Sequence, residues 1–389
     1  MRLPAVLGYG FRPFFLAAAL AALLLITWWA ASLELHVPLA TAWPAALWHG
    51  HEMVYGFIVA AVSGFLLTAV PSWTGARGFA GWPLVLLVAL WLLGRLLVSS
   101  SAHWPLGVTA AADLAFLPAL AIMLLPPLSR TRNRNTPLLI ALAALCGANG
   151  WFYWAVDQGY AAYAQRALLV AVDIVLLLVT VIGGRIIPAF TSAALKARGG
   201  TLASRALPGV NTAAIAVMLA MVTLDATMPD SRPAGACALL AAGIQALRLS
   251  QWGGLRTLRL PIVWVLHLAY AWLPLGFALK ALALLTAARW PAFWLHALTV
   301  GAAATMIMAV ITRASLGHTG RPLVVSPITV LAYVLLTAAA AVRSLGPALP
   351  VPYAVVIGVS AFLWIAAFLL FLWVYTPVLL TRRVDGRAG

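Results

Sequence analysis

The feature that most constrains this chain is a series of long apolar runs that occupies almost its whole length. A helix of about 20 apolar residues can cross the hydrocarbon of a bilayer, because its backbone amides are paired within the helix. We count twelve such runs, which predict an all-α polytopic membrane protein with one bundle of about twelve helices. They lie near residues 14–33, 50–70, 82–99, 105–126, 136–156, 164–187, 209–228, 233–248, 261–286, 292–312, 325–343 and 351–376.

The composition excludes the other classes of protein. Of 389 residues 64% are hydrophobic and 8% are charged, and the charged share is about a third of that in a soluble domain. The net charge of +16 indicates no nucleic-acid partner, because the basic residues stand singly between apolar runs. No predicted loop exceeds the one from Pro188 to Pro208, so residues 1–389 are predicted to form a single integral-membrane domain.

The basic residues predict an orientation. Of the 24 Lys and Arg, 18 lie at the termini or in the loops after even-numbered runs, a side that the positive-inside rule assigns to the cytoplasm. Both termini are therefore expected there. The 18 are Arg2, Arg12, Arg77, Arg130, Arg132, Arg134, Arg185, Lys196, Arg198, Arg205, Arg248, Arg256, Arg259, Arg313, Arg321, Arg382, Arg383 and Arg387.

Histidines are the main candidates for chemistry, since five of the seven stand at or inside predicted spans. Ionisable groups inside a membrane are costly and commonly functional, and imidazole is a good ligand for haem iron and for copper. We therefore predict that five histidines bind a cofactor or metal, and the alternative for each is a hydrogen bond to water or a neighbouring helix. They are His49, His51, His267, His296 and His318.

The spacing of these histidines limits which can meet. Two residues apart on a helix, His49 and His51 diverge by about 200°, so they are predicted to serve different centres unless the helix is broken at Gly50. Together with His296 they belong to the outer rim, whereas His267 and His318 belong to the inner half. One site therefore cannot hold all five histidines.

Other polar residues have candidate supporting roles. Glu52 can orient a ligating imidazole or carry protons. Asp113 and Asp173, at membrane depth, are proton-relay candidates or structural partners for a cation such as Arg185. Arg185, Arg313 and Arg321 are candidates to pair with haem propionates or phosphate, and they are equally explained as charges that set the orientation. Gly317 and Gly320 are expected to frame a tight turn beside His318.

Several segments resemble the NnrS family of polytopic membrane proteins. The matching segments are Gly10–Phe15, Trp48–Met53, Gly64–Pro71, Trp73–Gly75, Gly184–Thr191, Trp264–Trp272, Leu295–Gly301 and Thr312–Arg321. They span most of the chain in order, whereas residues 196–260 match no motif.

The resemblance implies twelve spans, haem and copper, and a role in nitrosative stress and denitrification in the inner membrane of a bacterium. The expected partners are membrane lipid, nitric oxide or a nitrosyl adduct, and an electron donor that the sequence does not identify. Nitric oxide reduction at an iron–copper centre is the expected chemistry, and a transporter of a small solute or metal ion is the alternative. The His-x-His pair is also similar to that of the haem-copper oxidase main subunit. Covalent c-type haem is excluded, because no Cys-x-x-Cys-His motif exists.

Overall fold

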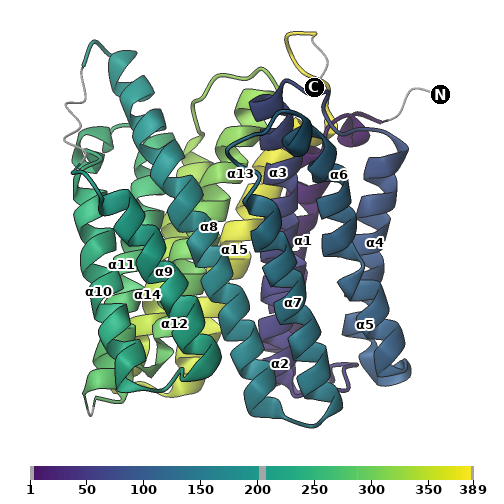
Figure 1. Cartoon of the computed structure of the whole chain (residues 1–389), viewed down its shortest axis with the longest axis vertical. Coiled ribbons are helices and arrows are strands. Elements are labelled where there is room, and N and C mark those ends of the chain that lie inside the picture. The colour runs from purple at the N-terminus through teal and green to yellow at the C-terminus, as the bar shows by residue number, and fades with distance from the viewer. Residues whose placement is uncertain (1–3, 201–206, 287, 387–389) are drawn as a thin grey trace. The chain divides into compact units, whose positions relative to one another are not determined.

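The computed structural model describes residues 4–200, 207–286 and 288–386, and every secondary-structure element in these ranges is helical (Figure 1). Within these described ranges, twelve helices are long and apolar enough to cross a membrane, which confirms the predicted fold class and the count of twelve. Three basic residues used to predict the orientation, Arg2, Arg205 and Arg387, lie outside the described ranges.

The helices follow the predicted runs closely. The α-helices are α1 (Phe11–Glu34), α2 (Ala45–His51), α3 (Val59–Thr74), α4 (Trp82–Ser99), α5 (Leu106–Leu114), α6 (Phe116–Arg130), α7 (Leu138–Asp157), α8 (Ala161–Lys196), α9 (Val210–Thr227), α10 (Arg232–Ser250), α11 (Pro261–Leu285), α12 (Trp294–His296), α13 (Thr305–His318), α14 (Pro327–Leu345) and α15 (Tyr353–Leu380). Two π-helices, η2 (Glu52–Ile58) and η6 (Ala297–Ala304), continue α2 and α12. Short 3-10 turns are η1 (Ala5–Leu7), η3 (Ser101–His103), η4 (Gly254–Thr257), η5 (Trp290–Phe293) and η7 (Gly346–Ala348).

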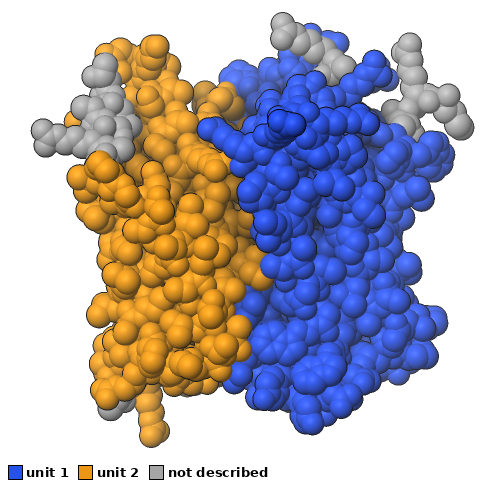
Figure 2. Space-filling view, in the orientation of Figure 1, with its two compact units in different colours: residues 1–171, 314–322, 368–389 blue, residues 172–313, 323–367 orange. Residues whose placement is uncertain are grey.

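The chain divides into two compact units (Figure 2). Unit 1 consists of residues 1–171, 314–322 and 368–389, and unit 2 consists of residues 172–313 and 323–367. Helices α8, α13 and α15 each contribute residues to both units. The expectation that the whole chain forms one bundle stays a prediction.

In unit 1, α1 packs against α3 and η2, α4 packs against α5, and α6 packs against α7. Arg12, at the start of α1, is fully buried. Its guanidinium donates to the carbonyls of Leu379 (2.9 Å) and Thr381 (2.6 Å), at the end of α15. The start of α1 and the end of α15 therefore meet at one end of unit 1, which agrees with an even number of spans.

In unit 2, α10 packs between α9 and α11, and η6 packs against α11 and α14. The starts of α10 and α14 follow from local chemistry. The Ser231 and Ser326 hydroxyls accept hydrogen bonds from the amides of Ala234 and Thr329, both at 3.2 Å, and so satisfy first-turn donors that have no partner within the helix.

The turn predicted between Gly317 and Gly320 is present, since the Gly320 amide donates to the Gly317 carbonyl at 3.3 Å. Helix α13 continues through Gly317 to His318, and only Gly320 adopts a positive φ, at 75°. The turn closes the end of α13, where the Arg321 amide also donates to the Leu316 carbonyl at 3.0 Å.

Two candidate histidines directly precede π-helical segments, which the hydropathy pattern does not predict. His51 is the last residue of α2 before η2, and His296 is the last residue of α12 before η6. A π-turn holds more than 3.6 residues, so the side chains that follow face a different direction from those of a continuous α-helix. Such segments are rare and occur frequently at functional sites.

Candidate functional site

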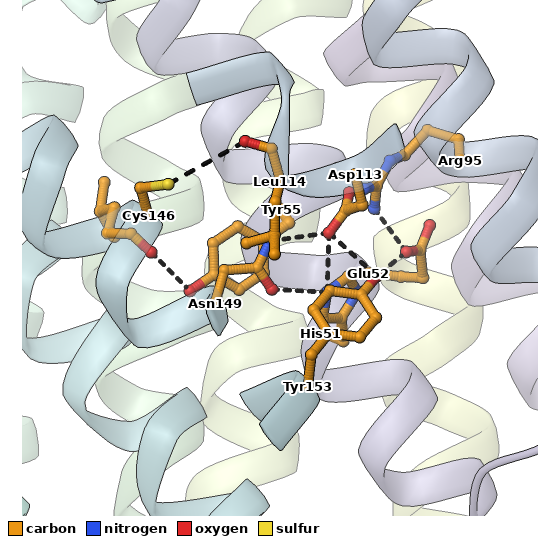
Figure 3. Close-up of polar contacts among 10 residues, drawn as sticks. His51, Glu52, Tyr55, Arg95, Asp113, Leu114, Cys146, Asn149 and Tyr153 are labelled. Carbon is orange, nitrogen blue, oxygen red and sulfur yellow. Dashed lines mark hydrogen bonds and ion pairs between the residues drawn. The ribbon is translucent and has the colours of Figure 1, made fainter. Parts of the chain in front are cut away.

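A group of buried polar side chains joins five helical segments of unit 1 (Figure 3). We call it the His51 cluster, and it consists of His51 (α2), Glu52 (η2), Arg95 (α4), Asp113 (α5), and Asn149 and Tyr153 (α7). None of the six is more than 7% exposed. Charged groups this deeply buried persist only where partners compensate them.

Arg95 lies at the centre of the charge arrangement. Its guanidinium forms ion pairs with the carboxylates of Glu52 and Asp113. The Asp113 Oδ2 atom also accepts hydrogen bonds from the Asn149 amide (2.7 Å) and the Tyr153 hydroxyl (3.2 Å). Asp113 therefore pairs with Arg95 and not with Arg185, the cation named as an example from the sequence.

Both ring nitrogens of His51 face hydrogen-bond acceptors. Nδ1 lies 3.2 Å from Glu52 Oε1, and Nε2 lies 3.0 Å from Asn149 Oδ1 and 3.2 Å from Asp113 Oδ2. The Asn149 amide nitrogen donates to Asp113, so the oxygen of Asn149 is the atom that faces the ring. With Glu52 and Asp113 ionised through their pairing with Arg95, both ring nitrogens act as donors, which is the doubly protonated imidazolium.

In this protonation state the His51 cluster is electrically neutral, because the charges of His51 and Arg95 balance those of Glu52 and Asp113. The proton on His51 lies within hydrogen-bond distance of a carboxylate on each side of the ring. Chemically, the cluster can hold a proton in the membrane and pass it to Glu52 or Asp113.

Aromatic rings enclose His51. The ring centres of Phe152, Tyr55 and Trp43 lie 4.8, 4.9 and 5.5 Å from the centre of the imidazole ring. Because these rings exclude water, they lower the local dielectric constant and strengthen the ion pairs of the cluster.

His49 has different neighbours. Its half-buried ring stacks on Trp29 of α1 at 4.2 Å, on another side of the helix from the His51 cluster. Gly50 is helical, so the helix is not broken between the two histidines. The predicted divergence of the two side chains is confirmed, and their assignment to different metal centres stays a prediction.

In unit 2, His267 of α11 is 7% exposed and lies 2.8 Å, through Nε2, from the hydroxyl of Thr191 on α8. That hydroxyl donates to the Ile187 carbonyl at 2.8 Å, so its oxygen accepts from the His267 Nε2–H. Nδ1 therefore carries a lone pair, and within the described residues it has no hydrogen-bond partner. A histidine fixed in this way through one nitrogen is typical of a metal ligand.

His318 and Arg321 lie in unit 1, beside the start of the chain. The His318 ring stacks on Tyr9 at 6.3 Å, and Arg321 donates to the Thr381 hydroxyl at 3.1 Å. Burial raises the pKa of the Tyr9 hydroxyl, and the nearby charge of Arg383 acts in the opposite direction.

The remaining candidates do not join the His51 cluster. His296 is half-buried in unit 2. The guanidinium of Arg313 lies 3.9 Å from the Phe190 ring, and Arg185 is an exposed residue of α8. Asp173 lies in unit 2, fully buried beside Asp225 and Lys280.

Several buried polar residues are not among the candidates predicted from the sequence. Arg95 and Lys280 each stand alone within a predicted span, which was the available signal, and they belong to the six Lys and Arg outside the predicted cytoplasmic side. Arg248 was assigned to a loop, yet it is 3% exposed and donates to the Thr180 carbonyl (2.7 Å), the Tyr270 hydroxyl (2.8 Å) and Asn211 (2.8 Å).

The candidate histidines fit the ligand requirements of haem better than those of a copper centre with several protein ligands. In the described ranges, no group of three His, Cys, Asp or Glu side chains is arranged to hold a metal ion. In its doubly protonated form, His51 has no lone pair to offer a metal. His267 Nδ1 does have one, so it fits an individual ligand, and haem needs only one or two ligands from the protein. Among the residues that the structure describes, a copper centre with three or more such ligands is therefore not assembled within either unit.

Comparison with known proteins identifies the family. The chain matches the family described as NnrS protein over residues 5–383, which is nearly its whole length. Among curated proteins, no sequence matches it. With this coverage and a helical membrane fold that agrees with it, the chain belongs to the NnrS family.

Proposed function

We propose that this protein handles nitric oxide or its metal adducts within the bacterial inner membrane, as a haem- and copper-containing protein with both termini in the cytoplasm. Its role would be defence against nitrosative stress linked to denitrification. The observation that carries the proposal is the neutral, buried His51 cluster in a chain of the NnrS family.

Reduction of nitric oxide inside the membrane would require a supply of protons. Two molecules of nitric oxide, two electrons and two protons give one nitrous oxide and one water. Nitric oxide is small and uncharged, so it enters from the lipid, and an external donor supplies the electrons. Protons cannot cross hydrocarbon unaided, so residues of the protein must hold them. In the His51 cluster, the protonated His51 would hold protons next to the carboxylates of Glu52 and Asp113.

Individual histidines would hold the cofactors. His49, His267, His296 and His318 are the candidates, and His267 has the strongest support because its Nδ1 lone pair is buried and unpartnered within the described chain. Bound haem and copper would supply the redox chemistry. His51 would bind a metal only after leaving its present hydrogen bonds, and we assign it to proton holding.

The visible absorption spectrum of the purified full-length protein, with haem and copper quantified, tests the proposal. We expect a haem Soret band that shifts when nitric oxide is added. His49→Ala and His267→Ala should each lower cofactor content, and His103→Ala, an exposed histidine, should leave it unchanged. Folded protein that contains neither haem nor copper would contradict the proposal.

A second candidate function is proton-coupled transport of a small solute or metal ion. The observation that favours it is that unit 1 and unit 2 each contain a buried cluster of acidic and basic side chains. Pathways of transporters are marked by such residues. Proton-driven solute uptake into liposomes by protein without haem and copper would support transport over nitric oxide chemistry.

A further inference from the structure

Unit 2 contains a buried charge cluster that is separate from the candidate histidines. We call it the Lys280 triad, and it consists of Asp173 (α8), Asp225 (α9) and Lys280 (α11), all 0% exposed. The Lys280 ammonium forms an ion pair with Asp225 Oδ2. It also lies 3.4 Å from Met221 Sδ and 4.5 Å from the centre of the Trp294 ring.

The oxygen atoms of the triad are only partly satisfied. Within the described residues, neither carboxyl oxygen of Asp173 has a hydrogen-bond partner, and neither does Asp225 Oδ1. Asp173 nevertheless lies close to both Asp225 and Lys280. A fully buried carboxylate without a donor costs several kcal/mol, roughly the penalty of an uncompensated ion.

The net charge of the Lys280 triad also indicates that a positive charge is missing. Two carboxylates and one ammonium leave the triad with one excess negative charge in an apolar interior. A further titratable side chain close to the triad is Cys237 of α10, whose thiol donates to the Val217 carbonyl at 3.7 Å and is neutral in that role. One added positive charge would make the triad neutral.

We propose that the Lys280 triad is a proton-binding site, with the proton carried by Asp173. The protonated Asp173 can donate to Asp225 Oδ1, while Lys280 remains paired with Asp225 Oδ2. Exchange involves one O–H bond only: the proton leaves one carboxyl oxygen and joins the other. The site gives unit 2 a proton-holding group of its own, independent of any haem or copper.

A metal cation fits this site less well than a proton. Hard cations such as calcium and magnesium take six or more oxygen ligands, and the triad has three oxygens without a partner. The ammonium of Lys280 would also repel a second cation. A proton needs only one oxygen and one acceptor.

Infrared spectroscopy of the full-length protein in lipid at neutral pH tests the proposal directly. A protonated carboxyl gives a C=O stretching band that carboxylates lack, and the band shifts in deuterated water. We expect this band in the unmodified protein and its loss in Asp173→Asn. The control is Asp157→Asn, an exposed carboxylate, which should leave the band unchanged.

Two further variants make the test independent of any single substitution. In Asp225→Asn, the remaining Asp173 should ionise and pair with Lys280, so the band should also be lost. In Lys280→Met, both carboxyls should become protonated, and the band should roughly double. Asp173→Asn should fold normally, because the amide resembles the neutral acid, and circular dichroism would check this.

Three results would overturn the proposal: no acid band in the unmodified protein, a band unaffected in folded Asp173→Asn, or a band abolished by sodium or magnesium ions, which would indicate a metal site. Since the infrared band needs neither haem nor copper, it tests the proton-binding site independently of the nitric oxide proposal. Metal content should also be unchanged in Asp173→Asn.

Discussion

Removing the guanidinium of Arg95 should be among the most costly single changes in unit 1. We expect Arg95→Met to lower the free energy of unfolding by about 3–5 kcal/mol at neutral pH, the usual effect of deleting one partner of a buried ion pair. The reason is that Arg95 pairs with both Glu52 and Asp113, which are 0% and 5% exposed.

The loss of unfolding free energy in Arg95→Met should match one uncompensated charge and not two, because Asp113 keeps other partners. Without Arg95, Asp113 keeps its hydrogen bonds from Asn149 and Tyr153, at 2.7 and 3.2 Å. Glu52 keeps only the His51 contact at 3.2 Å, and its Oε2 atom has no partner among the described residues. The cluster would then carry one net negative charge, located mainly on Glu52.

Titration with a denaturing detergent in mixed micelles, followed by circular dichroism, measures this free energy. The double variant Glu52→Gln/Arg95→Met keeps the cluster neutral and should recover most of the loss. Arg130→Met removes an exposed arginine and should change stability by less than about 0.5 kcal/mol. The reasoning would be refuted if Arg95→Met were as stable as Arg130→Met, or if the double variant were no better than the single one.

Two further predictions concern unit 2 and the topology. Gly184→Ala should lower the free energy of unfolding by about 2–3 kcal/mol in the same titration, because its Cβ would overlap the Arg248 guanidinium and displace it from its hydrogen bonds. The control Gly183→Ala places its Cβ 3.5 Å from the Tyr270 ring, an ordinary contact, and should be neutral or slightly stabilising. Equal losses in the two variants would contradict this account of Arg248. Reporter fusions at Gly199 and Asp230, on either side of α9, should report opposite sides of the membrane, and the same side at both would mean that α9 does not cross.

The sequence predicts the spans well and the partners poorly, for a physical reason. Crossing hydrocarbon imposes a length and an apolar composition, and both can be read from a single run of residues. Asp113 and Asp173 stood out for the same reason, since a charge in such a run is costly.

Which helices pack together is not encoded in the hydropathy of any one of them. Arg95 and Asp113 are 18 positions apart, and Lys280 and Asp225 are 55 apart. Asn149 and Tyr153 are neutral and look unremarkable in an apolar run, yet they fix the orientation of Asp113 and His51. The protonation assigned to His51 follows only from these three-dimensional contacts.

The most direct test of the functional account is nitric oxide consumption by metal-loaded protein in liposomes, without oxygen and with a chemical reductant. The account predicts that the unmodified protein converts nitric oxide to nitrous oxide and takes up one proton for each nitric oxide consumed. Glu52→Gln should slow this conversion about a hundredfold, the usual contribution of a positioned proton-transfer group, while Asp157→Asn should not. Fully loaded protein that consumes no nitric oxide, or Glu52→Gln protein as fast as the unmodified form, would contradict it.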